Sequence, residues 1–106
     1  MDDLSRQEEV EQRYHSLVQE GRYAEALDMA TREAHIFPKH SQKVIFSWRM
    51  DLACRLGNHR LALGILGEAV GAGCWYAGLR DDPDFGPLHG DTEFQRLAAI
   101  CEERRA

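Results

Sequence analysis

Acidic residues and one histidine gather in the segment 81–94, which reads DDPDFGPLHGDTEF. The carboxylates of Asp82, Asp84 and Asp91, with His89 between them, are groups that can bind a metal ion or move protons. They also fit an architectural role, because an aspartate at the start of a helix accepts hydrogen bonds from free backbone amides. The segment contains the same pattern twice, an aspartate, a short acidic stretch and a phenylalanine. We therefore predict two helix caps here rather than a metal or acid–base site.

Other candidates for chemistry are weaker. The glycines of GILGEAVGAGC, residues 64–74, lack the preceding strand and the Gly-Lys-Ser/Thr of a phosphate-binding loop, so we expect them to allow close helix packing. His35 and His40 surround Pro38 without a third metal ligand nearby. No Gly-x-Ser-x-Gly motif is present. We expect no catalytic residue, no cofactor and no metal, so the chain is predicted not to be an enzyme.

The three cysteines carry little chemistry. Cys54, Cys74 and Cys101 are odd in number, far apart in the chain and without the CxxC spacing of a zinc or redox site. Free cysteines usually pack as small hydrophobic side chains. We expect all three to be reduced thiols.

The composition is that of one folded domain. The chain has 106 residues, of which 43% are hydrophobic and 29% charged, a balance typical of globular proteins. The net charge of −5 argues against a nucleic-acid partner, because phosphate binding needs a basic surface. No stretch approaches the roughly 20 apolar residues of a membrane span, and the start MDDLSRQEEVEQR is too charged for a signal peptide. We expect a single cytoplasmic domain, 1–106, with no membrane partner.

Apolar residues recur at the spacing of an α-helix in five segments. In chain order they are Val10, Tyr14, Leu17 and Val18; Tyr23, Ala26, Leu27, Ala30, Ala34 and Phe37; Phe46, Met50, Ala53 and Cys54; Ala62, Ile65, Leu66, Ala69 and Val70; and Phe94, Leu97, Ala98 and Cys101. Pro38 is expected to stop the second helix, and Ser41 and Asn58 to cap the third and fourth. No convincing strand pattern appears, so the predicted fold class is all-α.

The chain contains one helical hairpin twice. A shift of 36 residues lays Gly21 on Gly57 and aligns the helices on either side of each glycine. We place the first copy at 7–40 and the second at 43–76, followed by a capping segment at 77–104. The two glycines are predicted to form equivalent turns.

The stretch GRYAEAL at 21–27, followed by Pro38, resembles the turn and second helix of a tetratricopeptide repeat. The segment 75–97 is similar to the closing segment LRxDPDFxPLxxDPxFxxL that often follows bacterial arrays of this repeat. Arg13 and Arg49 depart from the repeat, which usually has a buried leucine there. The resemblance implies stacked antiparallel hairpins in a short right-handed superhelix with a C-terminal capping helix.

Tetratricopeptide proteins bind partners in a groove lined by the first helix of each hairpin. By this resemblance the candidate partner-binding residues are Glu11, His15, Gln19, Val44, Ser47, Trp48, Asp51 and Arg55. Arg55 or Arg80 could pair with an acidic peptide. Trp48 has two interpretations, as an interface side chain or as one that packs against the capping segment.

Three functions remain open. The first is a non-enzymatic module that binds a peptide, a helix or a second copy of itself through the helix-lined surface. The alternative is an accessory or regulatory helical domain for an α/β-hydrolase-like enzyme, because similar segments occur fused ahead of such domains. The remote alternative is a small metal-binding protein or enzyme.

The third helix also predicts self-association. Its apolar residues extend beyond one stripe and are Val44, Ile45, Trp48, Leu52 and Leu56. One neighbouring helix is not expected to cover them all. A symmetric homodimer, or a docked second domain, would bury the surplus through a surface that includes Trp48.

Overall fold

The computed structural model describes residues 3–105, so residues 1, 2 and 106 of the expected domain lie outside the described part. Five α-helices form most of it: α1 (Asp3–Gln19), α2 (Tyr23–Glu33), α3 (Gln42–Arg55), α4 (His59–Gly71) and α5 (Thr92–Arg105). Short 3₁₀ turns connect them: η1 (Ala34–Ile36), η2 (Lys39–Ser41), η3 (Leu79–Asp81) and η4 (Pro83–Leu88). Residues 3–105 contain no strand, which confirms the all-α class.

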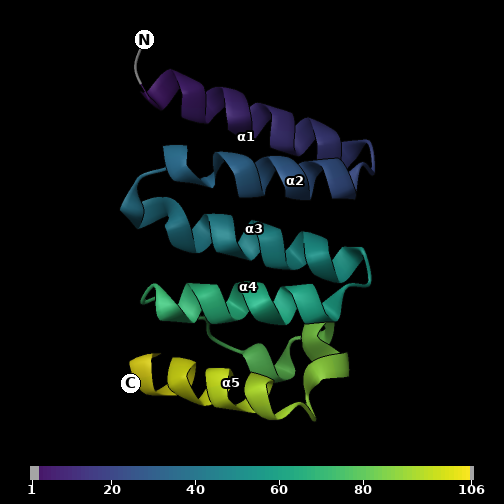
Figure 1. Ribbon diagram of the computed structural model, residues 1–106, viewed down its shortest axis with the longest axis vertical. Coiled ribbons are helices and arrows are strands. Elements are labelled where there is room, and N and C mark those ends of the chain that lie inside the picture. The colour runs from purple at the N-terminus through teal and green to yellow at the C-terminus, as the bar shows by residue number, and fades with distance from the viewer. Residues whose placement is uncertain (1–2, 106) are drawn as a thin grey trace.

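The helices are stacked in chain order. Figure 1 shows α1 to α4 as successive antiparallel neighbours, with α5 beneath α4. Helix α2 packs against α1 and α3, and α4 packs against α3 and α5. The described chain measures 44 × 29 × 17 Å along its principal axes. This stacking of antiparallel helices agrees with the prediction from the sequence, whereas the right-handed superhelix stays a prediction.

The two glycine turns are equivalent, as the internal repeat predicts. Gly21 and Gly57 have φ angles of 74° and 75°, in the left-handed region that glycine adopts without strain. In the first turn the amide of Arg22 donates to the carbonyl of Leu17 at 2.9 Å. In the second, Asn58 donates in the same way to Ala53 at 2.9 Å. This bond, from the residue after the glycine to the last turn of the helix, closes the helix end.

One of the two predicted helix caps in the hairpins is correct. The side chain of Asn58 accepts a hydrogen bond from the amide of Leu61 at 3.1 Å, which caps α4. The prediction for Ser41 is wrong, because its side chain makes no capping bond at the start of α3. The side-chain Nε2 of Gln42 instead donates back to the carbonyls of Ala34 and Phe37, at 3.0 and 2.9 Å. This long side chain therefore ties the start of α3 to the end of the preceding helix.

Both aspartates of the repeated pattern begin a helix, as predicted. The carboxylate of Asp82 accepts from the amide of Asp84 at 2.9 Å, at the start of η4. Asp91 accepts from the amides of Glu93 and Phe94, at 2.9 and 3.1 Å, at the start of α5. The repeated pattern thus marks two helix starts. Within residues 3–105, no three histidine, cysteine or acidic side chains are grouped so that they could hold a metal ion.

The core consists of two clusters that meet at α3. Val10 and Tyr14 of α1 pack with Ile45 and Leu52 of α3, together with buried residues of α2. The opposite side of α3 packs against α4 and the capping segment, through residues such as Met50. Helix α3 therefore lies between two neighbours and has two apolar sides. The expectation that one neighbour leaves its surplus exposed is wrong for Ile45 and Leu52, which are buried.

The predicted close packing of the α4 glycines applies to only one interior position. A Cβ on Gly67 would lie 4.0 Å from the side chain of Leu97 in α5, an ordinary van der Waals contact. A Cβ on Gly64 would meet nothing within 4 Å. Among the described helices, none combines the length and the apolar character needed to cross a membrane.

Candidate functional site

An aromatic cluster joins α1 to α3. The ring of Trp48 stacks on that of Tyr14, with centroids 4.1 Å apart, and meets His15 edge-on at 5.9 Å. Phe37 also approaches Trp48 edge-on, at 6.2 Å. Trp48 is half-buried and belongs to the cluster formed by α1, α2 and α3, so the interpretation that it packs against the capping segment is wrong. Burial, and secondarily the carboxylate of Asp51, raise the pKa of Tyr14 to about 12, so its hydroxyl stays neutral.

Arg55 lies beside this cluster, and its positive charge is already paired with a carboxylate. Its Nε donates to the Asp51 carboxylate at 3.0 Å, a pair one helical turn apart. Its guanidinium also lies 5.3 Å from the ring centroid of Tyr23 and donates to the Tyr23 hydroxyl at 3.4 Å. An acidic peptide would have to compete with Asp51 for this arginine.

The remaining candidate residues do not form one site. Glu11 and Gln19 are exposed on α1. On α3, Val44 is 50% exposed, and the hydroxyl of Ser47 donates to its carbonyl at 2.9 Å. Arg80 lies in η3 and pairs with Glu102 of α5 at 2.9 Å. The structure thus gathers His15, Trp48, Asp51 and Arg55, and places Arg80 with the capping segment.

A small cavity of about 160 Å³ lies between α3 and the capping segment. Its lining includes Cys54 and the carboxylates of Asp51, Asp82 and Asp84. Burial, followed by the negative charges of Asp84, Asp51 and Asp82, raises the pKa of the Cys54 thiol to about 11. The thiolate is the nucleophilic form of cysteine. Cys54 is therefore protonated at neutral pH and a poor nucleophile.

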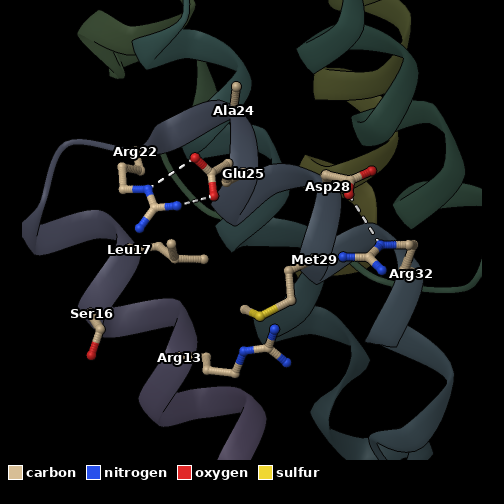
Figure 2. Close-up of a pocket in the computed structure, with 9 residues that line it drawn as sticks. All are labelled: Arg13, Ser16, Leu17, Arg22, Ala24, Glu25, Asp28, Met29 and Arg32. Atoms are coloured by element: carbon tan, nitrogen blue, oxygen red, sulfur yellow. Dashed lines mark hydrogen bonds and ion pairs between the residues drawn. The ribbon is translucent and has the colours of Figure 1, made fainter.

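A groove with a volume of about 500 Å³ lies between α1 and α2, and Figure 2 shows its lining. Arg22 pairs with Glu25 at 2.9 Å, and Arg32 pairs with Asp28 at 3.1 Å. Arg13 points into the same groove (Figure 2) and has no acidic partner in residues 3–105. None of the candidate residues predicted from the sequence lies in this groove. One feature of the sequence could have indicated the groove: Arg13 occupies a position where the tetratricopeptide repeat usually has a buried leucine.

Comparisons with known proteins identify the chain at the level of its family. No match was found among curated proteins or among solved structures. The family model described as "A/B hydrolase-like, N-terminal domain" matches residues 9–106. The leading functional interpretation, a non-enzymatic module that binds a peptide, a helix or a second copy of itself, is corrected by this match, which favours the accessory-domain alternative.

The identification as a tetratricopeptide repeat protein is wrong for the same reason. A glycine turn and a small alanine allow two helices to approach in any helical hairpin, so these residues are not specific to that repeat. The two arginines that depart from the repeat are informative: Arg13 is exposed, and Arg49 pairs with Glu68 at 3.4 Å. The exposed Arg13 does not pack as the repeat's buried leucine would, and Arg49, although its side chain is only 12% exposed, ends in an ion pair. The chain belongs to the family of A/B hydrolase-like N-terminal domains.

Proposed function

We propose that this chain is a helical accessory or regulatory domain that serves an α/β-hydrolase-like enzyme. The observation that carries the proposal is the family match across 9–106, which covers all of α2 to α4 and the capping segment. The hydrolase-like domain would perform the chemistry, and the helical stack would bind to it. The binding would modify its stability or the access of substrates to it.

The chemistry of the described residues supports a non-catalytic role. The thiol of Cys54, which lines a small cavity, has a pKa of about 11 and is not activated. The carboxylates of Asp82 and Asp91 are occupied as helix caps. We therefore extend the proposal to a domain that is not itself an enzyme.

A cytoplasmic location is part of the proposal. Cys54, Cys74 and Cys101 are free thiols, which is the usual state of cysteine in a reducing compartment. Alkylation of intact cells followed by mass spectrometry would test this part. Reversibly oxidised forms of the three cysteines would contradict it.

Direct measurement of a complex tests the main proposal. The chain is mixed with an α/β-hydrolase-like domain encoded in the same polypeptide or in a neighbouring reading frame. Sedimentation velocity should show a stoichiometric complex. The complex should also have a higher melting temperature than the free hydrolase-like domain, or a changed rate on a chromogenic ester. Separate sedimentation at high concentration, with unchanged ester hydrolysis, would contradict the proposal.

A further inference from the structure

A second groove, of about 400 Å³, lies where the start of α3 meets the end of α4. It is lined by Lys39, Gln42, Lys43, Phe46, Ala72, Gly73, Cys74 and Trp75. Phe46 and Trp75 are half-buried and pack against the larger core cluster, so they form a firm apolar wall. None of these lining residues is acidic. The groove therefore combines apolar side chains with two positive charges.

The two positive charges of this groove both come from lysine. Lys39 and Lys43 are the only lysines in the sequence, and both line this groove. Within residues 3–105 neither has a carboxylate partner, whereas arginines such as Arg22 and Arg80 are paired with acids. A chain with a net charge of −5 thus concentrates two unneutralised ammonium groups at one apolar groove.

Lys43 is held in position without being neutralised. Its Nζ lies 4.2 Å from the ring centroid of Trp75 and 5.4 Å from that of Tyr76. The Tyr76 hydroxyl donates to the main-chain carbonyl of Lys43 at 2.7 Å, which ties the two segments together. A cation over aromatic rings is attracted to them but keeps its full charge and its N–H donors. An incoming anion therefore meets a positioned ammonium, and the Lys43 side chain loses less conformational entropy when the anion binds.

We propose that this groove docks the α/β-hydrolase-like domain by accepting one of its acidic side chains together with a neighbouring apolar one. The carboxylate pairs with Lys43 and Lys39, and the apolar side chain lies against Phe46 and Trp75. Charge complementarity favours this occupant, because the groove holds two cations and no acid. The inference rests on the proposed function and names the surface through which that function operates.

Carbodiimide cross-linking of the complex tests the surface directly. The reagent joins a lysine amine to a carboxylate only when the two are in contact, and it does not join arginine. With two lysines in the sequence, the cross-linked peptides are unambiguous by mass spectrometry. We expect Lys39 or Lys43 to be linked to an aspartate or glutamate of the hydrolase-like domain.

Charge variants measured by calorimetry provide the quantitative test. The double variant Lys39→Gln/Lys43→Gln should bind the hydrolase-like domain about tenfold more weakly or worse, the loss expected when close charge pairs are removed from an interface. Lys39→Arg/Lys43→Arg should retain binding and lose the cross-links. The matched control is Arg13→Gln/Arg105→Gln, which also removes two exposed positive charges and should bind as the wild type does. Circular dichroism establishes that each variant is folded.

The outcomes separate the two proposals. If the complex forms but the Lys→Gln variant binds normally, or if neither lysine is cross-linked, the docking surface is wrong and the proposed function stands. Equal weakening by the arginine control would also overturn the docking surface, because the effect would then come from net charge alone. The absence of any complex would overturn both.

Discussion

Two phenylalanines hold the capping segment to the core. Phe94 is 1% exposed and its ring stacks on that of Phe85, with centroids 5.6 Å apart. Replacing Phe94 with alanine should lower the free energy of unfolding by about 3–5 kcal/mol, because it leaves a cavity at this position. Urea unfolding measures the change, and Phe94→Leu, which retains most of the volume, should cost less. Equal stability of Phe94→Ala and the wild type would mean that the ring is not buried in solution.

Single residues also show what a sequence can and cannot reveal about a site. Asp91 and Asn58 act locally on the next few amides, so their roles as caps could be predicted from their positions. The neighbours of Trp48 could not, because its contact with Tyr14 joins residues from two different helices. The lysine groove depends on Trp75 and Lys43 meeting across the fold, which no local pattern records.

At the scale of elements, the start of α4 depends on one side chain. Asn58→Ala should destabilise the protein by about 1 kcal/mol, because it removes the acceptor for the Leu61 amide. Asn58→Ser, which can still cap, should restore most of the loss. Ser41→Ala is the matched control at the start of α3 and should have little effect, since Ser41 makes no capping bond. A larger loss for Ser41→Ala than for Asn58→Ala, measured by urea unfolding, would reverse these assignments.

The start of α5 should make stability depend on acidity. The hydrogen bond from the Phe94 amide, with a further contribution from Arg60, lowers the pKa of Asp91 in the folded state. As the pH falls, the Asp91 carboxylate therefore binds a proton more readily in the unfolded chain than in the folded one. The stabilisation is present above the unfolded pKa of about 3.9 and is lost as the pH falls through the lower folded value.

Urea unfolding of the wild type and of Asp91→Asn between pH 7 and pH 2.5 measures this effect. The wild type should be more stable at neutral pH, and the difference should shrink in the acidic range. Asp84→Asn is the control, because the Asp84 carboxylate accepts no hydrogen bond within residues 3–105. A difference between the wild type and Asp91→Asn that does not change with pH would show that the charge of Asp91 is not involved.

The all-α class could be predicted from the sequence, whereas the family could not. The spacing of apolar residues and the turns at Gly21 and Gly57 indicate helical hairpins. Many helical families share these features, because antiparallel helices joined by short loops follow the same packing rules. The spacing of apolar residues on α3 predicts a surplus that a dimer would bury, because spacing alone does not show that a helix lies between two neighbours. The homodimer stays a prediction, with Val44 and Leu56 as its exposed apolar residues on α3 and in its C-cap.

At the scale of the whole molecule, the helices should differ in local stability. Helix α3 contributes buried residues to both core clusters, whereas α1 contributes Val10 and Tyr14 to one. Hydrogen exchange should therefore be slowest for the amides of α3 and α4 and fastest for those of α1, because a helix with fewer buried contacts opens more easily. Mass spectrometry of peptides from exchanged protein measures this order. Slower exchange in α1 than in α3 would require a contact that covers α1 in solution.

The stacking order also has a kinetic consequence. Helices α1 to α4 each pack against the helix that follows in the chain, so most of the core joins segments close in sequence. Closing short loops loses little chain entropy, and proteins rich in such local contacts fold in microseconds to milliseconds. The contacts between α5 and α4 join residues farther apart in the chain, such as Arg104, which donates to the carbonyls of Val70 and Cys74 at 2.7 and 2.8 Å. The hairpins can thus form while the chain is still being synthesised, and the closure of α5 over α4 must wait until α5 itself has been made.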